Sequence, residues 1–492
     1  MLPVPTLQAV SFAALLLAAS VGLAAAPTRA AEQPNIVFIL SDDVGYGDLS
    51  CYGQQNFQTP RIDRMAAQGL RFSQHYSGST VCAPSRACLL TGQHTGRVHQ
   101  RGNGPVRFRE DPRDVTIATR LKAAGYDTAM IGKSGLACRS QDGGLPGRKG
   151  FDHFFGFLDH AAAHRYYPKH LWRNGAKVAY PNNRGKEGED YSGDLFLADT
   201  LRYLDERAGA DRPFFLHLAV QQSHADLQVP DAWRQKFLGR YDEPRVKKSG
   251  NYRYEPNPKA TYAAMMAYLD DTVGQVLDRL QSLGLAEDTL VLFASDNGAM
   301  SEGHWRSEYF QSSGPLRGGK RDLYEGGIRT PLIAWWPGTV TPGGQSDHLS
   351  AFWDFAPTAC ELAGLPPLTA EETDGISYAA TLRGDAAAQR QHGLLYWEFY
   401  ERGGKQAVRL GGGDSRWKGV RLQVGRDRNG PIELYDLQAD LGETTDVAAE
   451  HPEVVQRVSR AMDAAHTPSP IFKFGGQKAK KGIKGKRPQQ KT

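Results

Sequence analysis

The chain has 492 residues, of which 40% are hydrophobic and 23% are charged. This balance is typical of a soluble globular protein with a large core, and it excludes a coiled coil, a fibrous repeat and a wholly disordered chain. The net charge of +5 comes from residues 471–492, which contain eight basic residues and no acid; without them the charge is −3, which excludes a nucleic-acid binder with a basic body.

The two ends of the chain differ in composition from the body. Residues 9–26 are apolar and rich in small residues, which predicts an export signal over residues 1–31. No other stretch approaches the roughly 20 apolar residues of a membrane span, so we expect a periplasmic or secreted protein without a transmembrane anchor. We expect residues 471–492 to form a basic disordered tail, with weak binding to an anionic polymer or membrane as the alternative. The five cysteines are too few for a disulfide scaffold, and their odd number leaves at least one unpaired.

Hydrophobic patterns predict alternating strands and helices up to about residue 390. The apolar run Asn35–Leu40 is typical of a parallel strand that is buried on both faces. Four similar runs follow, and four helical patterns lie among them: strands at Thr128–Ile131, Phe214–Val220, Thr289–Ala294 and Thr330–Trp336; helices at Ile62–Gln68, Ile117–Ala124, Ala260–Leu283 and Phe352–Ala363. This alternation predicts an α/β fold with a large, doubly wound, mixed but mostly parallel sheet over residues 32–390.

The pattern changes after Gln391. Short strand-like runs at Ala407–Leu410, Trp417–Val424 and Ile432–Leu437 precede a helical pattern at Glu453–Ala464. We therefore expect residues 391–470 to form a smaller α+β subdomain with a short antiparallel sheet.

Acidic residues follow two of the predicted strands directly. Asp42 and Asp43 come after the first strand, and Asp296 and Asn297 follow the strand at 289–294. Ligands of open α/β sheets bind at the carboxyl ends of strands, and a set of oxygen ligands suits Ca²⁺ or Mg²⁺. Each pair taken alone also fits a helix cap or an Asx-turn, and spacing does not show that the two pairs meet.

The segment Cys82-Ala-Pro-Ser-Arg86-Ala-Cys-Leu-Leu-Thr-Gly92 predicts a helix that begins near Cys82. Backbone N–H groups at a helix N-terminus favour an anion, and Arg86 adds a planar cation one turn later. An ordinary reactive or buried cysteine is the alternative. A soft thiolate is a poor partner for a hard cation, so Cys82 does not act as a thiol if both features belong to one site.

These motifs together resemble the type I sulfatases of the alkaline-phosphatase superfamily, from Pro34 to about Pro452. The resemblance is carried by Cys82-x-Pro-Ser-Arg86 with Leu89-Leu-Thr-Gly92, and by the following shorter matches in the same order: Asp42-Asp43, Gly132-Lys133, Ser295-Asp-Asn-Gly298, Leu316-Arg-Gly-Gly-Lys320, Glu325-Gly-Gly-Ile-Arg329, Leu434-Tyr-Asp-Leu437 and Gly442-Glu443. It implies hydrolysis of sulfate esters, through a formylglycine that a separate maturation enzyme makes from Cys82.

The resemblance also implies roles for single residues. Asp42, Asp43, Asp296 and Asn297 would hold a Ca²⁺, or less favourably Mg²⁺, with the modified residue 82 completing the metal site. One hydroxyl of the hydrated aldehyde would attack sulfur, and deprotonation of the other would expel sulfate. The basic residues that would surround the sulfate are Arg86, Lys133, His224 and Lys320. A surface position for His224 and solvated lysines are the alternatives.

One position departs from the family pattern. The family commonly has Lys-Trp-His-Leu-Gly where this chain has Lys133-Ser-Gly135-Leu-Ala137, so the usual histidine is replaced by Gly135. We expect His164, or His160, to reach the site instead. In that case Gly135→His combined with His164→Ala would restore turnover. A weakened or inactive enzyme is the alternative.

The sequence motifs say less about the identity of the substrate. Aromatic and basic residues in 164–172 and 304–310 could line a sugar site or simply pack within their loops. By analogy with exported sulfatases we expect a sulfated carbohydrate. The competing hypotheses are a phosphate or phosphonate ester hydrolase on the same scaffold and a non-catalytic polysaccharide-binding relative.

Overall fold

The computed structural model describes residues 1, 3, 33–104, 107–136, 143–248 and 250–474. The predicted export signal, most of the basic tail and Cys138 lie outside these residues. Among the described cysteines, Cys51, Cys82, Cys88 and Cys360 are all free thiols. Within the described part of the chain, no helix combines the length and the apolar character needed to cross a bilayer.

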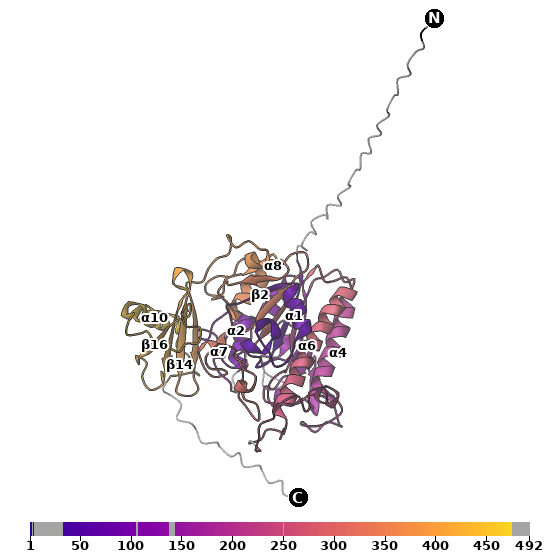
Figure 1. Ribbon diagram of the computed structural model, residues 1–492, viewed down its shortest axis with the longest axis horizontal. Coiled ribbons are helices and arrows are strands. Elements are labelled where there is room, and N and C mark those ends of the chain that lie inside the picture. Colours follow the sequence, from indigo (N-terminus) through magenta and orange to yellow (C-terminus); the bar gives the residue numbers. More distant parts are fainter. Residues whose placement is uncertain (2, 4–32, 105–106, 137–142, 249, 475–492) are drawn as a thin grey trace.

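A ten-stranded mixed sheet forms the centre of the molecule, which confirms the predicted fold class (Figure 1). Its strand order is β11-β2-β10-β9-β1-β8-β4-β5-β6-β7. The strands are β1 (Asn35–Ser41), β2 (Leu70–Phe72), β4 (Asp127–Lys133), β5 (His153–Phe157), β6 (His170–Arg173), β7 (Ala176–Ala179), β8 (Phe214–Ala219), β9 (Thr289–Ser295), β10 (Leu332–Trp335) and β11 (Gly344–Ser346). The five central strands, β9, β1, β8, β4 and β5, are all parallel.

Helices cover both faces of this sheet. Alternate residues of β1 point to opposite faces: Phe38 and Leu40 pack into one core, and Val37 and Ile39 into the other. The first core includes α2 (Cys82–Thr91), α3 (Ile117–Ala123), α8 (Phe355–Leu362) and α9 (Ala379–Leu382). The second includes α1 (Pro60–Ala67), α4 (Ser192–Arg207) and the long α6 (Pro258–Ser282). Two short helices, α5 (Asp231–Arg234) and α7 (Glu325–Ile328), and a two-stranded sheet of β3 (His75–Tyr76) and β12 (Ser350–Ala351) complete this part.

The C-terminal part forms a four-stranded antiparallel sheet against α10 (Pro452–Ala465), at the left of Figure 1. Its strands are β13 (Leu394–Phe399), β14 (Lys405–Leu410), β15 (Trp417–Leu422) and β16 (Ile432–Asp436). Sequence patterns predicted the last three strands and the helix but missed β13. Lys418, on β15, makes buried ion pairs with Glu325 and Glu443, and so ties this sheet to the α7 segment.

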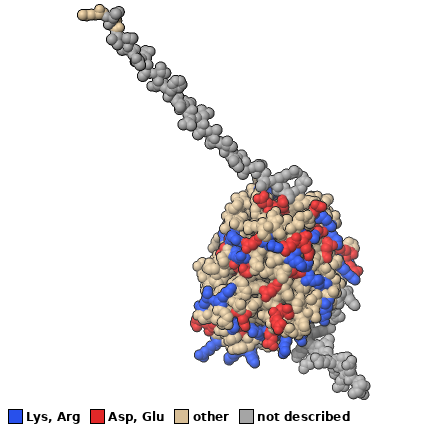
Figure 2. Space-filling view, turned by 90° about the vertical axis from the view of Figure 1, so that its right-hand side faces the viewer, with Lys and Arg blue, Asp and Glu red and all other residues tan. Residues whose placement is uncertain are grey.

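Acidic and basic side chains are interspersed over the face of the molecule shown in Figure 2. This mixture agrees with the nearly neutral charge of the body once the tail is excluded. The face shown therefore carries no large field of one sign.

Candidate active site

The carboxyl ends of the five parallel strands meet at one edge of the sheet. Each strand ends at or just before a polar residue: β9 before Asp296, β1 before Asp42, β8 a few residues before His224, β4 at Lys133 and β5 a few residues before His160. Adjacent strands therefore deliver these residues to one place, as expected at the carboxyl edge of an open α/β sheet.

The two acidic clusters predicted from the sequence lie side by side. Ser41 of β1 pairs with Ser295 of β9, so the residues that follow them are neighbours. The Asp43 N–H donates to Asp296 Oδ1 (3.1 Å), and Asn297 Nδ2 donates to Asp43 Oδ1 (2.7 Å). One oxygen from each of Asp42, Asp43 and Asp296 lies within 4.8 Å of the others. The clusters thus form one buried group rather than two separate caps.

Three buried cations face these three carboxylates. Lys133 Nζ donates to Asp42 Oδ2 (2.6 Å), and Lys320 Nζ donates to Asp43 Oδ2 (2.7 Å). Arg86 Nε donates to Asp296 Oδ2 (2.9 Å), and Arg86 Nη2 forms an ion pair with the same oxygen (2.8 Å). Arg86 Nη1 donates to the Lys133 carbonyl (2.9 Å). Each buried carboxylate is therefore matched by one buried cation, which keeps the group neutral as a whole.

These pairings shift the carboxylate pKa values in opposite directions. Burial acts to raise the pKa of Asp42, but the charges of Lys133, His224 and Arg86 hold it well below its usual range. Burial and the neighbouring Asp42 charge raise the pKa of Asp296 to about 7. For Asp296, burial is the larger cause and the like charge of Asp42 the second, and a cation placed between the carboxylates would relieve the second.

Two oxygens of this group remain without a partner. Asp42 Oδ1 and Asn297 Oδ1 are buried and accept no hydrogen bond from the described residues. Unpaired buried acceptors are costly, and both lie in a set of carboxylate and amide oxygens. The residues present therefore fit a hard divalent cation.

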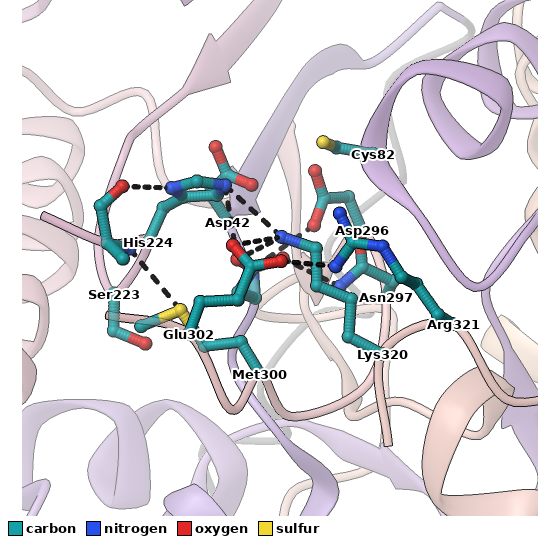
Figure 3. A network of polar contacts seen from close by, with 12 residues as sticks. Asp42, Cys82, Ser223, His224, Asp296, Asn297, Met300, Glu302, Lys320 and Arg321 are labelled. Atoms are coloured by element: carbon teal, nitrogen blue, oxygen red, sulfur yellow. Dashed lines mark hydrogen bonds and ion pairs between the residues drawn. The ribbon is translucent and has the colours of Figure 1, made fainter. Parts of the chain in front are cut away.

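Cys82 lies against this group at the start of α2, as the sequence predicted. Its Sγ lies within 4.8 Å of a ligand oxygen of Asp42 and a ring nitrogen of His224, and Figure 3 shows it beside Asp296. Burial raises the pKa of the Cys82 thiol to about 11, so the thiol is protonated at neutral pH and is a weak nucleophile.

His160 contacts Cys82 directly. Its Nε2 lies 3.0 Å from Cys82 Sγ. Burial and the charge of Lys133 lower the pKa of His160 well below its usual range. A protonated thiol beside a neutral imidazole makes Sγ–H the donor and Nε2 the acceptor.

The structure places His164 next to a different partner. Its ring centroid lies 4.3 Å from that of His224, whose Nε2 is 3.2 Å from Lys320 Nζ and 3.3 Å from Asp43 Oδ2. No hydrogen bond between His164 and Cys82 occurs among the described residues. His224 is buried, so it is no surface histidine. All of the predicted site residues are thus brought together, with His160 and His164 in separate contacts.

A cleft of about 760 Å³ opens beside Lys320. Charged residues line it on several sides, and they include Glu302, Glu308, Arg321 and Arg402. Of the aromatic residues that could line a sugar site, Trp305 and Phe310 are instead buried, and Trp305 stacks on Tyr262 of α6 with ring centroids 3.7 Å apart. For these two residues, loop packing is the correct interpretation.

Two residues of the site carried no sequence signal. Glu302 Oε2 lies 3.4 Å from Lys320 Nζ, and the other carboxylate oxygen of Glu302 pairs with Arg321 (Figure 3). Glu302 also lies within ligand distance of Asp43 and His224. Both residues are in loops, where neither strand ends nor helix periodicity indicate which side chains face the site.

Comparison with known proteins identifies the family. The family model for sulfatases matches residues 34–365, and the model for the C-terminal part of N-sulphoglucosamine sulphohydrolase matches residues 318–467. The chain belongs to the sulfatase family. It is a sulfuric ester hydrolase with an α/β catalytic core, and sulfatases typically use a formylglycine and a metal ion.

Individual relatives cover most of the chain. N-acetylgalactosamine-6-sulfatase of Canis lupus familiaris is 32% identical over 83% of this chain and 76% of its own length. Arylsulfatase A of Homo sapiens is 32% identical over 93% of this chain and 92% of its own. Among solved structures, Ps i-CgsB in complex with k-i-k-neocarrahexaose has a TM-score of 0.71 at 26% identity, and the match covers 88% of this chain and 92% of that one.

Proposed function

We propose that this sulfatase hydrolyses a sulfate ester of a glycan outside the cytoplasm, with a formylglycine made from Cys82 and a bound Ca²⁺. The observation that carries the proposal is the group of Asp42, Cys82 and His224, whose ligand atoms lie within 4.8 Å of one another and which shares Asp42 with the carboxylate cluster. A nucleophile position and a cation site thus coincide.

The sequence and the relatives support the remaining parts of this proposal. The apolar N-terminal segment 9–26 supports a periplasmic or secreted location. One relative is a sulfatase of N-acetylgalactosamine, and one structural neighbour is in complex with an oligosaccharide, which supports a glycan substrate. A formylglycine at residue 82 requires a maturation enzyme as a partner of the newly made chain.

Four residues would hold the cation: Asp42, Asp43, Asp296 and Asn297. Their oxygens include the unpaired Asp42 Oδ1 and Asn297 Oδ1, and residue 82 lies beside them. Ca²⁺ accepts six to eight oxygen ligands in flexible arrangements, whereas Mg²⁺ requires a near-octahedral shell and keeps several waters. A buried cluster that offers several protein oxygens therefore favours Ca²⁺.

With both groups in place, residue 82 supplies a hydroxyl nucleophile whose pKa the cation lowers. The surrounding side chains bind the sulfate and offset the charge that develops during the reaction. Arg86 and Lys133 are buried cations on the side of α2 and β4, where they orient the sulfate oxygens and offset their charge. Lys320 lines the cleft and contacts His224, so this pair faces the leaving alcohol oxygen and offsets the charge that develops there.

Mass spectrometry of the peptide that contains residue 82 tests this proposal. We expect an aldehyde at that position in active enzyme, a higher rate on nitrophenyl sulfate than on nitrophenyl phosphate, and loss of turnover in Cys82→Ala. An intact thiol in fully active enzyme overturns the proposed nucleophile. A faster reaction with the phosphate ester assigns the chain to phosphate ester chemistry instead.

A further inference from the structure

His160 is the imidazole that contacts residue 82. It lies between β5 and the short 3-10 helix Ala162–His164, on a segment whose strand is the parallel neighbour of β4. Its Nε2 is 3.0 Å from Cys82 Sγ, the atom that stands where one hydroxyl of the oxidised, hydrated residue would be. Its other nitrogen, Nδ1, is buried and has no hydrogen-bond partner among the described residues. Among the described residues, His160 makes no second side-chain hydrogen bond that would hold it in a structural pairing.

Neither Gly135 nor His164 provides an equivalent group, and His224, which has a ring nitrogen within 4.8 Å of Cys82 Sγ, is already engaged through Nε2 with Lys320 and Asp43. Gly135, in the loop after β4, has φ +70°, and a Cβ there would lie 2.9 Å from Arg86 Cδ. A histidine side chain at this position would be strained and would press on Arg86, so the rescue expected of Gly135→His with His164→Ala stays a prediction that this packing opposes. The His164 ring packs at a tilt against the His224 ring and lies 6.2 Å, centroid to centroid, from His160. In this chain the imidazole in hydrogen-bond contact with residue 82 therefore comes from the loop after β5.

Resting on the function proposed above, we propose that His160 is a catalytic base in the release of sulfate from residue 82. Once the ester with sulfate has formed on Cβ, the remaining hydroxyl loses its proton to His160 Nε2. The O–H electron pair becomes the second bond of the aldehyde carbonyl. The bond between Cβ and the sulfate oxygen breaks, and sulfate leaves with that electron pair. Water then adds to the aldehyde, and the proton on His160 passes to solvent.

This assignment predicts which half of the reaction fails in a variant. His160→Ala keeps the groups that form the ester, so it releases one equivalent of nitrophenol from nitrophenyl sulfate in a rapid phase. Its steady-state rate falls about 10²–10⁴-fold, the usual contribution of a positioned base. The residue-82 peptide becomes heavier than its hydrated form by one SO₃ group, and added imidazole speeds the loss of that mass. His160→Gln accumulates the same adduct because an amide does not accept the proton.

Three controls make the experiment decisive. The aldehyde content of residue 82 is measured in every variant before substrate is added, so failed maturation, which bears on the proposed function, is distinguished from failure of the base. His451→Ala, in the C-terminal subdomain where His451 packs on Trp417, controls for loss of an imidazole and keeps the wild-type rate. Thermal unfolding confirms that the variants are folded, and His160→Gln replaces the alanine variant if that one is not.

The overturning results are equally specific. Steady-state turnover within a few fold of wild type in both His160 variants rejects the assignment. Loss of the rapid phase without an adduct assigns His160 to the first half of the reaction, and this result also rejects His160 as the base in sulfate release. An adduct that accumulates in His164→Ala but not in His160→Ala transfers the role to His164.

Discussion

Alanine at Gly135 tests how closely the loop after β4 packs on Arg86. A non-glycine residue in the left-handed region costs about 1–2 kcal/mol, and Gly135 has φ +70°. The added Cβ would lie 2.9 Å from Arg86 Cδ, whereas carbon atoms in contact are about 3.5–4.0 Å apart. Arg86 therefore has to move by roughly 0.5–1 Å. Its guanidinium is held by Asp296 and the Lys133 carbonyl, so the movement disturbs the site.

A misplacement of about 1 Å in a catalytic group costs up to about 10²-fold. We therefore expect Gly135→Ala to lower kcat/KM on nitrophenyl sulfate by about 10–100-fold and the free energy of unfolding by at least about 1–2 kcal/mol. Gly125→Ala is the matched control, because Gly125 has φ +94° and an added Cβ would meet nothing within 4 Å. We expect Gly125→Ala to lower the free energy of unfolding but to leave kcat/KM unchanged. Wild-type kcat/KM in Gly135→Ala, or an equal loss of activity in Gly125→Ala, refutes the reasoning.

Two further predictions concern buried charges away from the nucleophile. Burial raises the pKa of Asp48 from 3.8 to about 7, so its contribution to stability is complete below about pH 4 and is lost as the pH rises towards 7. Asp48→Asn should remove this pH dependence. The free energy of unfolding of the variant, measured in urea and relative to wild type, should increase by up to about 3 kcal/mol between about pH 5 and about pH 8. A difference that does not change with pH contradicts the raised pKa of Asp48. Lys418→Met leaves Glu325 and Glu443 buried without their shared cation, at 2.9 Å from each in the wild type. We expect the free energy of unfolding, measured in the same assay, to fall by about 3–5 kcal/mol. The control Lys177→Met, at an exposed position, should leave it unchanged. Equal stability of the two variants contradicts the role of these buried ion pairs.

The acidic half of the site was predictable because it depends on strand ends. Asp42 and Asp296 each come just after an apolar run whose length and composition are typical of a buried strand, and parallel strands place their carboxyl ends at one edge. Their contact requires more: β1 and β9 must be adjacent and in the register that pairs Ser41 with Ser295. Strand order depends on long-range packing, which single-sequence patterns do not encode.

The loop residues were less predictable for a related reason. His160 and His164 are four residues apart in a segment with only a short 3-10 turn, so no periodicity decides which one faces Cys82. Likewise Trp305 lies in a polar loop, and only the fold shows that the loop turns back onto Tyr262. Side chains on irregular backbone are oriented by tertiary contacts rather than by local pattern.

The charges of the site couple the cation to the substrate. Three buried carboxylates face Arg86, Lys133 and Lys320, so the site is neutral as described, and a divalent cation adds two positive charges that an incoming sulfate offsets. Because binding linkage is reciprocal, sulfate should raise the affinity for Ca²⁺, and Ca²⁺ that for sulfate, by one common factor of about 5–150. Calorimetric titration of Ca²⁺ with and without sulfate measures this factor. Lys320→Met, which removes one cation beside the cleft, should change it, whereas a Ca²⁺ affinity that is independent of sulfate would mean that the two ions do not share this group of charges.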